Sequence, residues 1–226
     1  MTFVGYIPAR AGSIRLKNKN FLDFFNGQSI TEIALNKSNQ CSTIKYTILD
    51  TDNVSFLDEM YKKNLTDYNH LRSDSLSSSE ITTAQALRDC IIKAENIFKN
   101  KISNIVVLQP SSPLISLDSI NIAIDKFIKN DLELVASFTR LPINLKDCFQ
   151  INENEIKKFG NSEINEENIL FETGGIYIIS KKRLFNSENP FQVDALSGIS
   201  IIPLNEYVDI DYYDQFLLAQ RLYIEI

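Results

Sequence analysis

Residues 3–8 read F-V-G-Y-I-P and lead directly into residues 9–20, which read A-R-A-G-S-I-R-L-K-N-K-N. The first run is apolar and ends in proline, a pattern typical of a short buried strand. The second run holds four cations, Arg10, Arg15, Lys17 and Lys19, with no carboxylate among them. Gly12 lets the backbone approach an anion closely. A strand followed by such a loop predicts a phosphate site, and a solvated basic loop is the plainer alternative.

Further apolar runs of strand length recur along the chain and alternate with segments of helical period. The expected strands are Phe3–Pro8, Tyr46–Leu49, Ile105–Gln109, Leu134–Phe138, Gly175–Ile179 and Ile199–Pro203. The expected helices are Ile30–Ser38, Val54–Asn64, Ile81–Asn100, Ser119–Lys129 and Tyr213–Tyr223. Strands that alternate with helices of this length need crossover connections. The pattern therefore predicts an α/β fold with a mostly parallel sheet and helices on both faces.

The length of 226 residues suits one domain, which we expect to span residues 1–226. The alternation breaks at residues 139–172, which are rich in polar and charged side chains. We interpret this segment as an inserted excursion. Ligands bind such sheets at the carboxyl ends of the strands. The expected site therefore combines the loops Ala9–Asn20, Asp50–Asn53 and Pro110–Ile115.

Charge and cysteine content exclude several classes of protein. A net charge of −6 and a pI near 4.9 argue against broad binding to a nucleic acid backbone. Cys41, Cys90 and Cys148 are widely spaced and suggest neither a disulfide framework nor a thiolate zinc site. No apolar stretch approaches the length that spans a membrane. We expect a cytoplasmic protein that binds neither nucleic acid nor a membrane.

Asp209 and Asp211 form a second feature with chemical meaning. In an extended segment their carboxylates lie on one face, while Val208 and Ile210 point to the other. Two carboxylates on one face suit Mg²⁺, which fills its remaining positions with phosphates and water. An edge strand or turn decorated with acids is the plainer interpretation of a bare D-x-D pair.

Residues 7–20 resemble the signature of the cytidylyltransferases that activate nonulosonic acids, the CMP-sialic acid synthetase family. Later segments resemble the family's other motifs in the same order, at residues 50–52, 72–83, 108–114, 173–178 and 208–211. Four positions depart from the pattern: Asp50 replaces serine, Ser79 aspartate, Ile115 arginine and Thr173 asparagine. The departures lie mostly where the sugar is expected.

The resemblance implies a Rossmann-like nucleotidyltransferase that uses Mg²⁺ to join CTP to a nonulosonic acid and releases pyrophosphate. Sialic (N-acetylneuraminic) and legionaminic acids are the expected substrates. The nucleotide-binding residues that it implies are Ala9, Arg10, Gly12, Ser13, Arg15, Lys19, Asn20, Arg72 and Thr83. It gives catalytic roles to Arg10, Lys19 and Asp211, and it makes Asp209 and Asp211 the metal ligands.

Gln109 follows the third expected strand, so its side chain should point into the crevice, and the family uses this glutamine for the sugar acid. Thr173 and Tyr177 are weaker candidates for the same role, because a strand tyrosine is often core. A glutamine bonded to its own loop is the plainer reading of Gln109. The family is also homodimeric, with the excursion interlocking the subunits, and we expect this of residues 139–172.

Other functions stay open at this point. CMP-KDO synthetases share the A-R-x-x-S-x-R start but have Q-G-D-E-P where residues 109–113 read Q-P-S-S-P. A CMP-pseudaminic acid synthetase and a nucleotide-binding regulatory module without catalysis are further alternatives. His70, the single histidine, lies in a polar stretch without a G-x-S-x-G motif. We interpret it as a solvated loop residue and not as part of a hydrolase triad.

Overall fold

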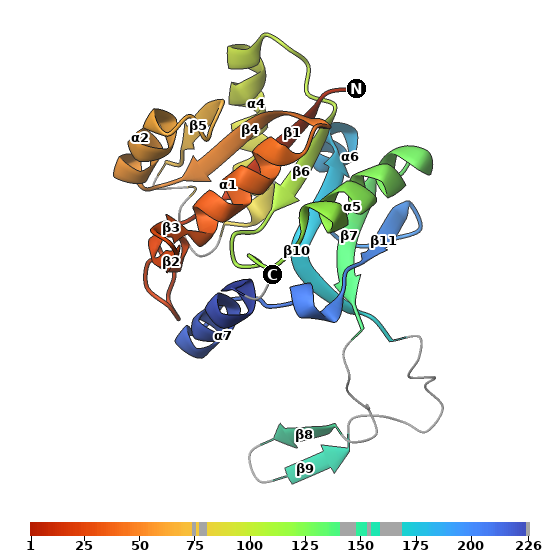
Figure 1. Ribbon diagram of the computed structural model, residues 1–226. Coiled ribbons are helices and arrows are strands. Elements are labelled where there is room, and N and C mark those ends of the chain that lie inside the picture. Colours follow the sequence, from red (N-terminus) through yellow and green to blue (C-terminus); the bar gives the residue numbers. More distant parts are fainter. Residues whose placement is uncertain (74–75, 77–80, 141–147, 153–154, 159–168, 225–226) are drawn as a thin grey trace.

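The centre of the fold is a seven-stranded sheet (Figure 1). The computed structural model describes residues 1–73, 76, 81–140, 148–152, 155–158 and 169–224. The strands of this sheet are β1 (Phe3–Pro8), β4 (Ile44–Thr51), β5 (Tyr68–Leu71), β6 (Asn104–Leu108), β7 (Leu134–Thr139), β10 (Phe171–Ser180) and β11 (Ser197–Ile201). Their order across the sheet is β11-β7-β10-β6-β1-β4-β5.

All neighbouring strands of the sheet are parallel except at β10, which is antiparallel to β6 and to β7. The predicted α/β fold with a mostly parallel sheet is therefore confirmed. From β1 the chain proceeds outward to β4 and β5, and then returns to β6 on the other side of β1. Such a reversal opens a crevice at the carboxyl ends of β1 and β6, where open α/β sheets bind ligands.

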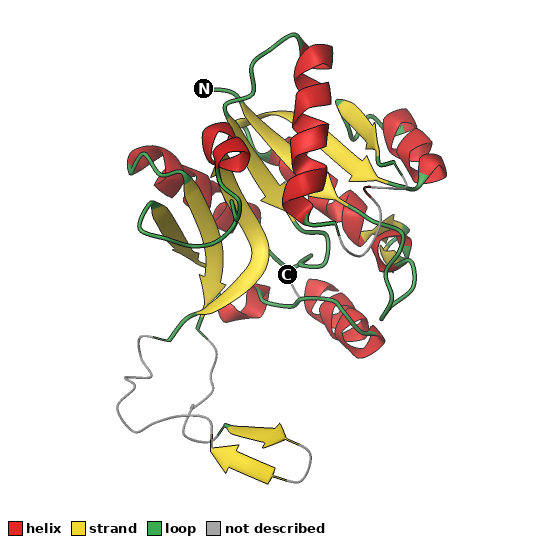
Figure 2. Cartoon of the chain, turned by 180° about the vertical axis from the view of Figure 1, so that it is seen from behind, coloured by secondary structure: helices red, strands yellow, loops and turns green. Residues whose placement is uncertain are grey.

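Helices cover both faces of the sheet. They are α1 (Ile30–Gln40), α2 (Val54–Lys62), α4 (Thr83–Phe98), α5 (Leu117–Lys129), α6 (Lys181–Asn186) and α7 (Tyr213–Ile224). Figure 1 shows α1 and α5 in front of the sheet, and α4 is the long central helix of the view from behind in Figure 2. No described helix is long and apolar enough to cross a bilayer.

Side-chain alternation along β1 explains these layers. Val4 and Tyr6 pack against the α4 side of the sheet, whereas Phe3 and Ile7 pack on the opposite side. Gly5 lets α1 approach the strand closely, because an added Cβ would overlap the hydroxyl of Ser38. The strand is thus apolar on both faces, as a central parallel strand should be.

Reciprocal capping fixes where α1 and α4 begin. In α1 the Ser29 hydroxyl accepts from the backbone of Glu32, whose carboxylate accepts from the backbone of Ser29. Thr82 and Gln85 make the same pair of bonds at the start of α4. This cap starts α4 at Thr83, two residues after the predicted start.

Among the described residues, two hairpins lie outside the main sheet. The first, β2 (Asp23–Phe25) and β3 (Gln28–Ser29), joins a core cluster with α7. The second, β8 (Phe149–Asn152) and β9 (Glu155–Lys158), stands apart from the main sheet in Figures 1 and 2. It belongs to the excursion expected at residues 139–172, of which residues 141–147, 153–154 and 159–168 lie outside the described residues.

Candidate active site

Two adjoining cavities open at the carboxyl ends of β1 and β6. One has a volume of about 570 Å³ and is lined mainly by the loop after β1, so we call it the loop chamber. The other has a volume of about 630 Å³ and reaches β10 and the loop after α6, so we call it the β10 chamber. The residues that line both chambers are Arg15, Lys19, Thr83, Gln109, Ser111 and Asp211. The chambers are therefore two parts of one cleft.

The loop chamber collects most of the residues expected to bind the nucleotide. Those that line it are Arg10, Ser13, Arg15, Lys19, Asn20, Arg72 and Thr83. Ala9 and Gly12 do not belong to its lining. The side chain of Ala9 is fully buried, its backbone N–H donates to the Asp50 carbonyl at 2.9 Å, and its carbonyl accepts from Thr51. Ala9 thus anchors the loop to β4.

Hydrogen bonds to the backbone give the basic loop its shape. The Asn20 amide donates to the Arg10 carbonyl at 2.9 Å, and Asn20 is itself buried. The backbone N–H of Ala11 donates to the Asp52 carboxylate at 2.7 Å. Asp52 comes from the loop after β4. Two of the expected ligand-binding loops therefore hold each other in place.

The segment that carries Asp209 and Asp211 is irregular, yet its side chains alternate as expected. Val208 and Ile210 are buried in the core next to α7, and both aspartates line the β10 chamber. The backbone N–H of Ile210 donates to the Ser111 carbonyl at 2.9 Å. This bond ties the aspartate pair to the loop after β6.

Asp211 is paired with two cations of the basic loop. Its carboxylate lies 2.6 Å from the Arg15 guanidinium and 3.0 Å from the Lys19 ammonium. Lys19 also donates to the Ile210 carbonyl at 2.5 Å. Within the described residues, no three or more His, Cys, Asp or Glu side chains gather into a metal cluster. Any metal here would need ligands from a bound molecule or water in addition to the aspartates.

The β10 chamber contains the three residues expected to bind the sugar acid. Gln109, Thr173 and Tyr177 all line it. Thr173 is largely buried, and its hydroxyl bonds to the Ser137 hydroxyl at 2.7 Å. The Tyr177 hydroxyl donates to the Glu172 carboxylate at 2.7 Å. Burial raises the pKa of Tyr177, and the bond to Glu172 raises it further, so the phenol stays protonated.

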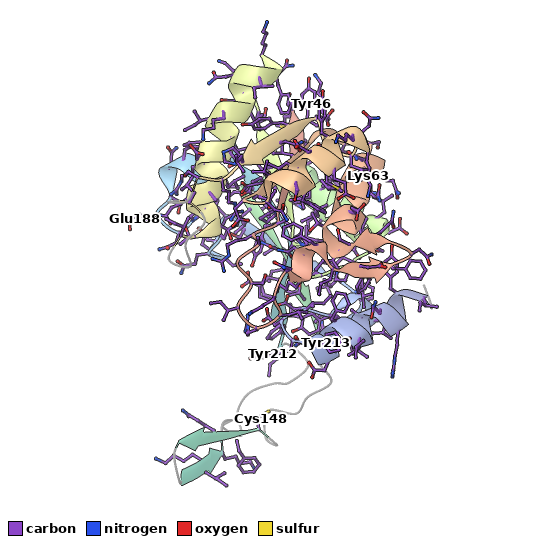
Figure 3. The ribbon with its side chains drawn as sticks, turned by 90° about the vertical axis from the view of Figure 1, so that its left-hand side faces the viewer. Tyr46, Lys63, Cys148, Glu188, Tyr212 and Tyr213 are labelled. Carbon is purple, nitrogen blue, oxygen red and sulfur yellow. The ribbon has the colours of Figure 1, made fainter. Side chains whose placement is uncertain are left out.

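The loop Glu188–Gln192 also lines the β10 chamber, and it was not among the residues expected at the site. Buried Arg183 holds this loop by donating to the carbonyls of Pro190 at 2.8 Å and Gln192 at 2.5 Å. The Phe191 ring meets the Tyr177 ring edge-on, with 5.1 Å between centroids. Figure 3 labels Glu188 at one side of the body. An asparagine-proline pair was the local sign of a loop here, but nothing local placed it at the cleft.

The family-level comparison settles the class of protein. Residues 4–197 match the family model described as Cytidylyltransferase. The chain belongs to the cytidylyltransferase family. It is therefore a nucleotidyltransferase, as the resemblance implied.

Individual relatives cover nearly the whole chain. A pseudaminic acid cytidylyltransferase from Campylobacter jejuni is 23% identical, over 96% of this chain and 94% of the relative. A CMP-N,N'-diacetyllegionaminic acid synthase from Legionella pneumophila is 26% identical, over 98% and 96%. A solved CMP-2-keto-3-deoxy-manno-octonic acid synthetase complexed with CTP has the same fold, with a TM-score of 0.70, 16% identity, and coverage of 100% and 99%.

The position of His70 in this cytidylyltransferase corrects the sequence analysis. His70 is not a solvated loop residue: it lies on β5 and is 1% exposed. Its ring nitrogens lie 2.8 Å from the Asp50 carboxylate and 3.0 Å from the Asp89 carboxylate. The prediction was wrong because Y-N-H-L is too polar to signal a strand. β5 is an edge strand, and His70 is its buried residue.

Proposed function

We propose that this cytidylyltransferase transfers a cytidylyl group from CTP to a nonulosonic acid and releases pyrophosphate. In this reaction a sugar hydroxyl oxygen forms a bond to the α-phosphorus, the bond to the β-phosphate oxygen breaks, and the hydroxyl proton leaves. The names of the Campylobacter and Legionella relatives support an acceptor of the pseudaminic or legionaminic class. Sialic acid belongs to the same class of nine-carbon keto acids.

The observation that carries the proposal is the two-chamber cleft. The loop chamber offers cations and a hydroxyl, which suits a triphosphate. The β10 chamber shares Arg15, Lys19 and Asp211 with it and adds carboxylates, neutral polar groups and aromatic rings, and the last two suit a sugar. Asp211 lies where the chambers meet. A donor and an acceptor bound side by side would place their reacting atoms near this carboxylate. Catalysis of this kind rests mainly on positioning and charge stabilisation.

For the nucleotide, we assign binding of the triphosphate to Arg10, Ser13, Arg15 and Lys19. Arginine forks suit phosphate oxygens, and a lysine ammonium can follow a departing pyrophosphate. Arg15 and Lys19 pair with Asp211 and would exchange that carboxylate for phosphate oxygens. We assign catalytic roles to Arg10 and Lys19 on this basis, and we assign Arg72 and Thr83 to the nucleoside.

We assign Mg²⁺ to Asp209 and Asp211. The pair fits this ion because both carboxylates line the chamber while their neighbours anchor the segment in the core. Mg²⁺ commonly takes one or two carboxylates and leaves its other positions to phosphates and water. Bound there, the ion would neutralise phosphate charge during the transfer.

For the acceptor, we assign binding of the nonulosonic acid to Gln109, Thr173 and Tyr177. Gln109 can both donate and accept, and its place between the chambers lets it contact the acceptor close to the nucleotide. Thr173 and Tyr177 already bond to Ser137 and Glu172, so their side chains are held in fixed positions. Fixed polar groups are what orients a ligand in a pocket.

The direct test is pyrophosphate release from each of the four nucleoside triphosphates, with Mg²⁺ and a panel of pseudaminic, legionaminic, sialic and KDO acids. We expect release with CTP and a nonulosonic acid, and none after the metal is chelated. Release with KDO alone would reassign the substrate. CTP binding without release for any acid would favour the regulatory module and contradict the proposed reaction.

We also propose a cytoplasmic homodimer of one domain, residues 1–226, in which the excursion at residues 139–172 contacts the second copy. The β8–β9 hairpin supports this, because Phe149 is 59% exposed and Ile156 is 69% exposed. Apolar side chains on a hairpin away from the body suit burial by another chain. In Figure 3 the hairpin and Cys148 lie beyond the end of the body that carries Tyr212 and Tyr213.

Light scattering at micromolar concentration tests the dimer. The mass should be near twice the 25.8 kDa of the chain. The double variant Phe149→Asp with Ile156→Asp should shift it toward the monomer, because two buried charges would oppose association. A double variant at exposed positions of the body, Lys129→Asp with Lys62→Asp, is the control. A wild-type monomer would contradict the proposal.

A further inference from the structure

Behind the loop chamber, three side chains converge on the buried carboxylate of Asp50. His70 contributes a ring nitrogen 2.8 Å from one carboxylate oxygen. Arg72 donates to the other oxygen through Nε at 2.8 Å, and its Nη2 lies 2.7 Å from that oxygen in an ion pair. Tyr6 donates its hydroxyl to that same oxygen. Asp50 and Tyr6 are fully buried, so the cluster is shielded from water.

Asp50 stays ionised inside this cluster. Burial raises its pKa, but the hydrogen bond with His70 and the charge of Arg72 outweigh burial and bring the pKa below its ordinary value. The guanidinium of Arg72 is therefore matched by a full negative charge. Arg15 and Lys19 also pair with a carboxylate, but their partner Asp211 lines the cleft, whereas Asp50 is fully buried.

Arg72 is the member of the cluster that reaches the cleft. It lines the loop chamber, and its backbone N–H donates to the Thr51 carbonyl at 3.0 Å. The contact with Asp50 engages the Nε and Nη2 edge of the guanidinium, which fixes the plane of the group. Because its charge is neutralised, Arg72 is suited to act as an oriented hydrogen-bond donor more than as an attractor of phosphate.

The ring nitrogen of His70 that does not face Asp50 also has a partner. This nitrogen lies 3.0 Å from the Asp89 carboxylate, and Asp89 is paired with Lys93 at 2.7 Å. Both of these residues come from α4. A ring bound at both nitrogens cannot turn, so it presents a fixed partner to Asp50.

We propose that Asp50 and His70 are positioning residues for the nucleotide, which act by holding the Arg72 guanidinium in one orientation toward the nucleoside of CTP. The inference rests on the proposed function, in which CTP occupies the loop chamber. Loss of the His70 contact would leave a carboxylate oxygen buried without its partner and would let Asp50 and Arg72 shift together. The consequence should appear in CTP affinity.

Two substitutions at His70 isolate the contact with Asp50. In His70→Asn the amide nitrogen can take the place of the inner ring nitrogen and donate to Asp50, whereas His70→Leu cannot donate. Both variants lose the bond to Asp89. Calorimetric titration with CTP and no sugar acid should show affinity within about threefold of wild type for His70→Asn, and about tenfold weaker affinity for His70→Leu. Circular dichroism checks that both are folded.

A double-mutant cycle separates positioning from a merely structural role. If His70 acts through Arg72, His70→Leu should weaken CTP binding in the wild-type protein and have no further effect in the Arg72→Ala background. A His70→Leu effect of equal size in both backgrounds, or unchanged affinity in His70→Leu, would overturn the inference. Should His70→Leu not fold, Tyr6→Phe removes another donor to Asp50, and the same cycle with Arg72→Ala decides. A wild-type protein that does not bind CTP would instead overturn the proposed function and the inference with it.

Discussion

Asp211 and its neighbour Ile210 join the segment before α7 to two other parts of the cleft. The Asp211 carboxylate pairs with Arg15 and Lys19 from the basic loop, and Ile210 bonds to Ser111 in the loop after β6. Asp211 also lines both chambers. A change at this carboxylate should therefore affect the reaction while leaving the core intact, because Val208 and Ile210 supply the buried contacts of the segment.

Asp211→Asn should lower kcat by about a hundredfold or more at saturating Mg²⁺, because the amide is a poor ligand for a hard cation. The measurement is the initial rate of pyrophosphate release as a function of Mg²⁺, together with the melting temperature. Asp214→Asn is the matched control, since Asp214 is an exposed aspartate on α7 that lines neither chamber. Wild-type dependence on Mg²⁺ in Asp211→Asn would remove this residue from the metal site.

Lys19→Ala should lower kcat by about a hundredfold, the loss expected when one preorganised charge-stabilising contact is removed. Lys19 lines both chambers and its side chain is only 16% exposed, so solvent does not fully screen its charge. Lys17→Ala is the control, because Lys17 belongs to the same loop, is exposed and lines neither chamber. Equal rates for the two variants would mean that the loop is merely basic.

Which residues reach the cleft was largely predictable from the sequence. Most of the expected nucleotide-binding residues line the cleft, because the loop after a central parallel strand begins at the carboxyl end of that strand, where such sheets bind ligands. Ala9 and Gly12 were the exceptions. The burial of Ala9 could not be predicted from a motif, since its backbone bonds to β4 only in the folded chain. The burial of His70 was equally invisible. It depends on Asp50 and Asp89, which lie 20 and 19 residues away.

A lysine on α1 forms a hydrogen bond with the loop after β6. Lys37 on this helix donates to the Pro113 carbonyl at 2.5 Å. Burial lowers the pKa of Lys37 to about 8, and the negative charge of Glu206 opposes part of that shift. The folded protein therefore binds this proton less tightly than the unfolded chain does.

The pH dependence of stability tests this arrangement. The pKa of Lys37 is lower in the folded state than in the unfolded chain. The contribution of Lys37 to the free energy of unfolding should therefore rise as the pH increases from about 8 to about 10.5, and it should be lost once the pH has fallen through about 8. Relative to Lys37→Met, wild type should gain about 3 kcal/mol across this window. Urea unfolding at several pH values measures it. Lys129→Met, a change at an exposed lysine of α5, should keep the wild-type rise. Parallel curves for wild type and Lys37→Met would refute the assignment.

Elements with strong periodicity were predicted well and weak ones were not. β1 was predicted at its observed bounds, and α1, α2, α5 and α7 were predicted within two residues at either end. β5 and α6 were missed because they are four and six residues long and bury few apolar side chains. The loop Glu188–Gln192 reaches the cleft through Arg183, a tertiary contact that no local pattern encodes.

The candidate active site lies where the order of strands in the sheet reverses, at the carboxyl ends of β1 and β6. Residues of the cleft come from the loop after β1, the loop after β6, the reversed strand β10 and the segment before α7. A parallel sheet was predictable from alternating elements, but the antiparallel direction of β10 was not, because hydrophobic periodicity does not show in which direction a strand runs. That reversed strand supplies two of the three residues assigned to the acceptor.

The most direct test of the central claim is the mass of the product formed from CTP, Mg²⁺ and either pseudaminic or legionaminic acid. Transfer of a cytidylyl group predicts a CMP-linked sugar acid, formed in equal amount with pyrophosphate and absent when the acid is omitted. Free CMP or CDP without the linked sugar, or no nucleotide product with either acid or with sialic acid, would contradict the account.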